Sequence, residues 1–163
     1  MALLGSMNRD VVEDSARTAL AAAGSYFLAH LLRMPEAYWA AISTIIVVQS
    51  TLGAALTISS QRFVGTVLGT ASGGLLSTYF ESNLAVFGVG VFLLGLVCAL
   101  LRLGTAYRFA GVTLTITMLV GRKVAPWVAA EHRFIEVSVG ILVGLMITAI
   151  WPKHLISKIV PKK

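Results

Sequence analysis

The chain has 163 residues, of which 57% are hydrophobic and 12% are charged. Soluble domains carry about 25% charged residues, so a soluble chain of this composition could not cover its surface with polar groups. The net charge of +6 does not indicate nucleic acid as a partner, because the basic residues stand singly or in pairs between apolar stretches. We therefore expect a lipid bilayer to surround this protein.

Six apolar stretches separated by short polar breaks predict the fold, an all-α integral membrane bundle of six transmembrane helices. The expected helices cover residues 15–32, 37–56, 62–80, 84–101, 106–120 and 134–151. The fifth is short for a span of roughly 20 residues, so we expect it to be tilted or irregular. Residues 15–151 would form the transmembrane domain between tails at 1–14 and 152–163. The Gly5-Ser6-Met7 string is typical of a cloning leader over residues 1–6.

The distribution of basic residues predicts the orientation of these helices. With six alternating spans, one side of the membrane carries nine of the thirteen Lys and Arg residues: Arg9, Arg17, Arg62, Arg102, Arg108, Lys153, Lys158, Lys162 and Lys163. The side richer in Lys and Arg is the cytoplasmic one. We therefore expect both termini, including the basic C-terminal tail, in the cytoplasm.

The sequence also contains a possible internal repeat. An Arg-Phe pair opens a helix twice, 71 residues apart, and two glycines follow each pair at the same spacing: Arg62, Phe63, Gly69 and Gly73, then Arg133, Phe134, Gly140 and Gly144. Residues 39–43 align with residues 109–113 at an offset of 70. This pattern predicts two three-helix halves of opposite orientation, a common construction in transporters. The alternative is a chance match of glycine pairs, which are frequent in membrane helices.

The helix at 62–80 carries glycine at every fourth position along one face, at Gly65, Gly69 and Gly73. Without side chains on this face, another helix can approach closely. One interpretation is that the face lines a narrow path for a solute. The other is static helix packing, which is the more common reason for such a pattern.

Charged residues within apolar helices are the sharper functional signal, because they are costly in lipid. Arg62 and Arg133 open matching helices, and their forked donors suit carboxylates, so they predict docking positions for a small organic anion. The alternative is that both arginines only anchor helix ends at headgroups. Glu136 lies three residues after Arg133, so the two can pair on one helix face, and Glu136 would carry a coupling proton or neutralise Arg133.

The expected second helix is unusually polar for a span. Gln49 cannot satisfy its amide against lipid, so we expect it to face protein or water near the midplane. Trp39 opens the same helix and has the aromatic character of a membrane interface. The sequence has no phosphate-binding loop, nucleophile elbow or metal-ligand spacing, so we expect no enzyme activity, no cofactor and no metal.

Three strings resemble a known family: Tyr38-Trp39-Ala40-Ala41-Ile42-Ser43, Val47-Val48-Gln49-Ser50 and Arg62-Phe63-Val64-Gly65-Thr66-Val67-Leu68-Gly69. An aromatic-Trp-Ala start and an Arg-x-x-Gly-Thr-x-x-Gly string are typical of the fusaric acid resistance and aromatic acid exporter family, the integral membrane bound transporter domains. The resemblance is strongest over residues 16–80 and weaker over residues 84–151. Plant aluminium-activated malate transporters look distantly related.

The resemblance implies a function and partners. Family members export weak aromatic carboxylates across the bacterial inner membrane, and some work with a periplasmic adaptor protein. Larger members have two six-helix blocks and a cytoplasmic domain, so this chain implies a homodimer that rebuilds the pair. Two alternatives stay open: a passive anion channel, and a non-transporting membrane subunit or scaffold of a larger complex.

Overall fold

The computed structural model describes residues 9–49, 51–80, 83–120 and 125–151. All regular secondary structure in the described residues is helical, which confirms the all-α class and the number of helices. They are α1 (Arg9–Leu31), α2 (Tyr38–Val47), α3 (Leu52–Tyr79), α4 (Leu84–Leu100), α5 (Ala106–Thr115) with the π-helix η1 (Ile116–Val120), and α6 (Pro126–Ile150).

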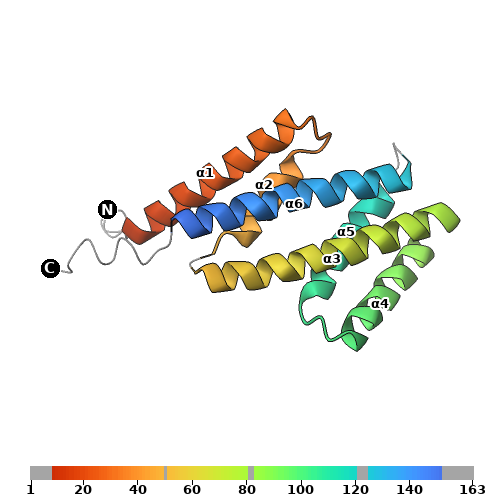
Figure 1. Cartoon of the computed structure of the whole chain (residues 1–163). Helices are drawn as coiled ribbons and strands as arrows, with labels where there is room; N and C mark the ends of the chain where they lie inside the picture. Colours follow the sequence, from red (N-terminus) through yellow and green to blue (C-terminus); the bar gives the residue numbers. More distant parts are fainter. Residues whose placement is uncertain (1–8, 50, 81–82, 121–124, 152–163) are drawn as a thin grey trace, which may run out of the picture.

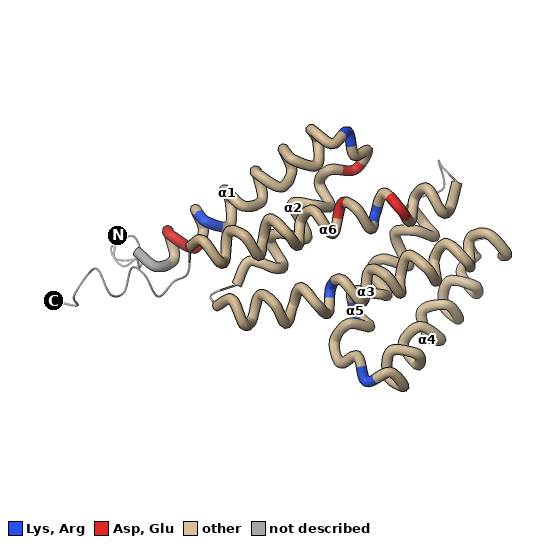
Figure 2. Tube along the Cα trace, in the orientation of Figure 1, with Lys and Arg blue, Asp and Glu red and all other residues tan. Residues whose placement is uncertain are grey.

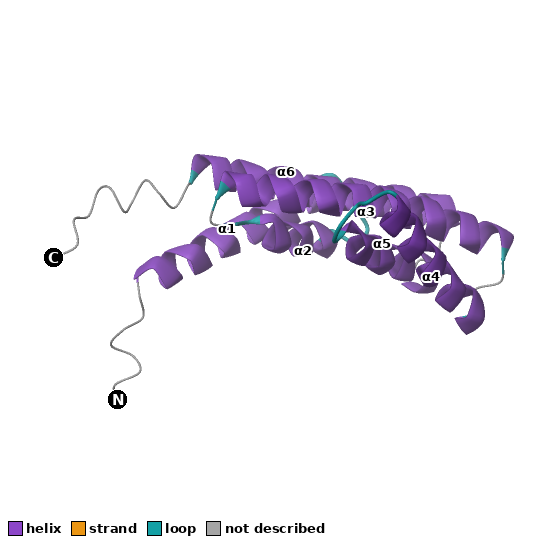
Figure 3. Cartoon of the chain, turned by 90° about the horizontal axis from the view of Figure 1, so that it is seen from below, coloured by secondary structure: helices purple, strands orange, loops and turns teal. Residues whose placement is uncertain are grey.

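Two long helices run through the length of the molecule (Figure 1). α3 and α6 lie side by side and antiparallel, with α1 and α2 against one end of this pair and α4 and α5 against the other. The bundle is elongated and thin when it is seen from below (Figure 3). α2 and α5 are the two short helices, and each belongs to a different half of the chain.

The boundary between the second and third helices differs from the prediction. α2 ends at Val47 rather than near residue 56, and α3 begins at Leu52 rather than at Arg62. Val48 has an extended backbone, and the side chain of Thr51 caps α3 by accepting a hydrogen bond from the Ala54 amide at 3.3 Å. A β-branched run before an N-cap threonine favours this break. Arg62 is therefore ten residues inside α3, and not at its start.

Other helix ends also shift. α1 begins at Arg9, within the expected tail of residues 1–14, and α6 begins at Pro126, eight residues before the expected start at Phe134. Proline suits the first turn of a helix because its missing amide is not needed there. α4 agrees with the expected range, and Asn83 caps it by accepting from the Val86 amide at 2.9 Å. The fifth helix is irregular as expected, since α5 continues into the π-helix η1.

The glycines of the two long helices allow the two short helices to approach closely. A Cβ added to Gly69 would lie 2.6 Å from Cβ of Thr113, and one added to Gly140 would lie 2.6 Å from Cβ of Ser43. The same is true one turn further on. A Cβ added to Gly73 would lie 2.8 Å from Cβ of Thr117, and one added to Gly144 would lie 2.8 Å from Cγ1 of Val47. The backbones of α3 and α5, and of α6 and α2, are therefore in direct contact.

Long stretches of the helices carry no charge (Figure 2). In the described part of the chain, α6 is the single helix that is both long and apolar enough to cross a membrane. α2, α4 and the 106–120 segment are apolar but shorter. The other five predicted spans therefore stay predictions.

The close approach of α3 and α5 predicts the effect of a single methyl group. We expect Gly69→Ala to destabilise the protein by about 1–3 kcal/mol, because the new Cβ would overlap the backbone of α5 and separate the helices. Thermal unfolding in detergent, followed by circular dichroism, measures the change. Gly95 of α4 has open space around it, so Gly95→Ala is the control and should change stability by no more than about 1 kcal/mol. Equal melting temperatures for the two variants would contradict the close contact.

Candidate functional site

Arg133 is the centre of a cluster of charged groups between α6 and the start of α2. Its side chain is 6% exposed, and Nη1 donates to Oε2 of Glu136 at 3.2 Å. Nη2 forms an ion pair with Oε2 of Glu36, which lies in the connection between α1 and α2. The guanidinium also lies 4.4 Å from the ring centre of Trp39, a cation–π contact. Arg133 is therefore fixed on three sides by protein groups.

Glu136 is fully buried and both of its carboxylate oxygens have partners. Oε2 accepts from Arg133, and Oε1 accepts from the backbone amide of Glu36 at 2.9 Å. Buried charges are stable only when they are paired and hydrogen-bonded, and this carboxylate meets both conditions. The predicted pair on one face of α6 is present, and it also holds the backbone just before α2.

Arg62 has a different environment from Arg133. It lies in the middle of α3 and is 5% exposed. Nη2 donates to Oγ of Ser43 at 3.0 Å, and the guanidinium lies 5.2 Å from the ring centre of Phe109 on α5. Among the residues that the structure describes, no carboxylate pairs with Arg62, and its Nε has no hydrogen-bond partner. Arg62 is close enough to Arg133 for electrostatic repulsion between them.

One turn of α2 connects the two arginines. The hydroxyl of Ser43 donates to the carbonyl oxygen of Trp39 at 2.8 Å, which leaves its lone pairs free to accept from Arg62. The ring of Trp39 lies against Arg133. Because Ser43 is fully buried and packs against Gly140, its side chain cannot easily turn away. The first two turns of α2 therefore position both guanidinium groups.

The remaining predicted site residues lie elsewhere. Gly65, Gly69 and Gly73 form the contact of α3 with α5, so the space beside this face is filled by helix. Gln49 does not lie in a helix; it follows the end of α2, and its side chain donates to the Ile46 carbonyl oxygen at 3.0 Å. The structure thus brings together Arg62, Arg133, Glu136 and Trp39, and leaves Gln49 outside this group.

Sequence reasoning missed Glu36 and Ser43. Glu36 is about one hundred residues from its ion-pair partner, so no local spacing reveals the contact. Ser43 was recognised only as one of several polar residues. For Glu36 the available signal was an acidic residue directly before the aromatic start of an apolar helix.

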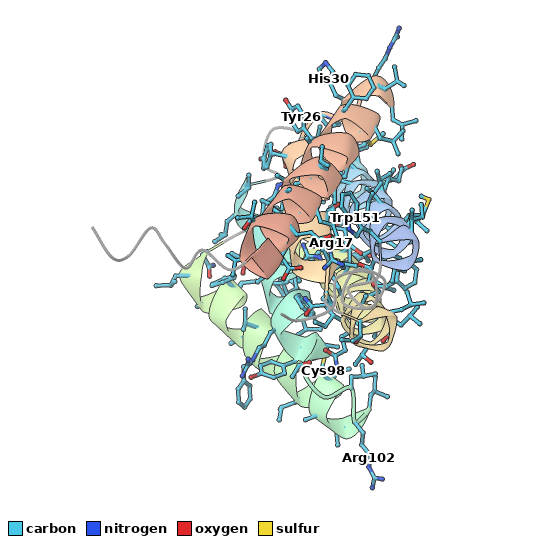
Figure 4. The ribbon with its side chains drawn as sticks, turned by 90° about the vertical axis from the view of Figure 1, so that its left-hand side faces the viewer. Arg17, Tyr26, His30, Cys98, Arg102 and Trp151 are labelled. Carbon is cyan, nitrogen blue, oxygen red and sulfur yellow. The ribbon has the colours of Figure 1, made fainter. Side chains whose placement is uncertain are left out.

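Sequence reasoning also missed Arg17, which forms a second cluster at the other end of α6. Its side chain is 4% exposed, and it donates to the backbone oxygens of Gln49 and Trp151, each at 2.9 Å. The indole of Trp151 in turn donates to Glu13 at 3.0 Å, and Figure 4 shows Arg17 and Trp151 side by side. The unpaired carbonyl groups at a helix end favour a cation, so Arg17 ties the ends of α2 and α6 to α1.

Apolar helices that bury a few paired charges between them are typical of membrane proteins that move ions or solutes. Residues 21–147 match the family model described as fusaric acid resistance protein-like, so the chain belongs to this family. The resemblance predicted from the sequence is confirmed. The family is membrane-associated, and its domains are of the transporter type rather than enzymes. No curated protein and no solved structure gives a significant match to the chain.

The buried cluster predicts a large stability effect at Glu136. We expect Glu136→Leu to cost about 3–5 kcal/mol, because Arg133 would lose its buried counter-charge and the Glu36 amide its acceptor. Chemical unfolding in detergent, followed by tryptophan fluorescence, measures the loss. Glu131 is an exposed carboxylate on the same helix, and Glu131→Leu should stay within about 0.5 kcal/mol of the parent protein. A small loss for both variants would show that the cluster contributes little.

Proposed function

We propose that this protein transports small organic anions, such as aromatic carboxylates, outward across the bacterial inner membrane. The observation that carries the proposal is Arg62. It is a buried cation whose described partners are a serine hydroxyl and an aromatic ring, so it has capacity for a carboxylate. Arginine binds carboxylates through two parallel hydrogen bonds, and burial strengthens this interaction. The family, whose domains are of the transporter type, supports the same class of function.

We propose further that the transmembrane domain is built from two inverted three-helix halves. The contacts that support this are reciprocal: α3 of the first half packs on α5 of the second, and α6 of the second half packs on α2 of the first. Arg62 lies against Phe109, and Arg133 lies against Trp39, at the same offsets of 71 and 70 residues. The rings of Phe63 and Phe134, which match each other in the repeat, are 5.5 Å apart.

In this proposal the short helices α2 and α5 flank the anion site. Substrate sites in inverted-repeat transporters lie where short or interrupted helices of the two halves meet. Ser43 of α2 and Phe109 of α5 both contact Arg62, so the anion would dock between the two halves. The six spans, the cytoplasmic termini, the domain limits of 15–151, a homodimer and a periplasmic adaptor are parts of the same proposal.

The transport proposal predicts the behaviour of Arg62→Gln. We expect efflux of labelled 4-hydroxybenzoate from liposomes that contain the purified protein to fall about ten-fold or more, because the carboxylate loses its charged hydrogen-bond donor. Arg108→Gln, at an exposed arginine of α5, is the control and should retain parental flux. Flux that increases with an imposed pH gradient indicates a proton-coupled exporter, and flux that follows voltage alone indicates a channel. Unchanged efflux in Arg62→Gln would contradict the proposed site.

A second prediction concerns the serine that orients Arg62. We expect Ser43→Ala to raise the half-saturating concentration of 4-hydroxybenzoate about three-fold with little change in maximal flux, because Arg62 loses its fixed acceptor. Ser60→Ala is the control, since the Ser60 hydroxyl is exposed and bonds within its own helix. A lower maximal flux at unchanged half-saturation would argue against a positioning role.

A further inference from the structure

We propose that the Nη2 edge of Arg133 is a carboxylate-binding position that Glu36 of the chain itself occupies, and that a substrate carboxylate displaces Glu36 from it. This inference rests on the proposed transport of organic anions. It assigns Glu36 the role of an internal competitor, which holds the position until an anion arrives.

Arg133 stays in place without the Glu36 side chain. Nη1 is bonded to Glu136 at 3.2 Å, and the guanidinium lies 4.4 Å from the centre of the Trp39 ring. Glu136 is itself fixed by the Glu36 backbone amide at 2.9 Å. Neither contact uses the Glu36 carboxylate. The donor at Nη2 is therefore held ready for whichever carboxylate reaches it.

Glu36, in contrast, is free to turn away. Its side chain is 33% exposed, whereas the side chains of Arg133 and Glu136 are 6% and 1% exposed. It lies in the connection between α1 and α2 rather than within a helix. Since its backbone amide is bonded to Glu136, only the side chain has to rotate to release Arg133.

The balance of charge favours exchange over simple addition. Arg133, Glu36 and Glu136 together carry a formal charge of −1 when both carboxylates are ionised, so these three groups give a further anion no net attraction. His132 also interacts electrostatically with Glu136, and Arg62 with Arg133. When one carboxylate replaces another at Nη2, the charge around Arg133 does not change. No buried charge is then left without a partner, which is the costly situation.

The inference predicts a gain of affinity when the competitor is removed. We expect Glu36→Gln to lower the half-saturating concentration of 4-hydroxybenzoate about five-fold, because a neutral amide holds Nη2 less strongly than a carboxylate. Both efflux from liposomes and binding by titration calorimetry of the purified protein measure this. Glu131→Gln, an exposed carboxylate two residues before Arg133 in the sequence, is the control and should bind as the parent protein does.

Two further variants make the test specific. Combining Glu36→Gln with Arg133→Gln should abolish the gain, and Glu36→Asp, which keeps the charge, should not show it. If Glu36→Gln does not fold, Glu36→Ala takes its place: tighter binding than the parent protein supports displacement, and equal or weaker binding overturns it. Unchanged or weaker binding by folded Glu36→Gln also overturns it.

The same measurements separate this inference from the transport proposal. If the parent protein moves no carboxylate but Glu36→Gln binds 4-hydroxybenzoate more tightly, the binding position stands and the transport proposal fails. If the parent protein transports and Glu36→Gln is unchanged, the transport proposal stands and the displacement of Glu36 fails.

Discussion

The direct contact of glycine faces with the two short helices is the constraint on which the rest of the structure depends. Because Gly140 and Gly144 have no side chains, α2 lies directly on α6, and Gly69 and Gly73 allow the same for α5 on α3. This close packing brings Ser43 and Phe109 to Arg62, and Trp39 to Arg133. Larger residues at the glycines would separate the helices and leave the guanidinium groups without their present partners.

Buried charge is the second constraint, and it acts through α2. Glu136 of α6 accepts from the chain just before this helix, and Glu36 and Trp39 contact Arg133 at its start. One turn later, Ser43 accepts from Arg62. A buried charge needs polar partners to offset its desolvation. Ser43 of α2 gives Arg62 a hydrogen bond, and the ring of Trp39, also of α2, lies against Arg133. A movement of α2 would therefore change the surroundings of both cations together.

Local signals predicted much of this arrangement. The apolar stretches indicated six helices, the glycine spacing indicated close helix contacts, and the three-residue spacing of Arg133 and Glu136 indicated their pair. The break after Val47 was missed because the polar residues Gln49 and Thr51 were interpreted as part of one unusually polar helix, whereas Thr51 is the N-cap of α3. The contact of Glu36 with Arg133 was out of reach, since it depends on how α2 lies against α6 rather than on any sequence spacing.

The two arginines match in the proposed repeat, yet their partners do not. At the same offsets, Glu36 corresponds to Ala106 and Glu136 corresponds to Gly65, so the carboxylates near Arg133 have no equivalents near Arg62. Gly65 instead packs directly against Phe109 and the start of α5. A symmetric pair of bare cations would bind an anion equally well in both halves and would hold it too firmly to release it. In the transport that we propose, the internal carboxylates would make the position at Arg133 exchangeable, whereas Arg62 would offer an anion an unneutralised cation, so the two positions would differ in strength.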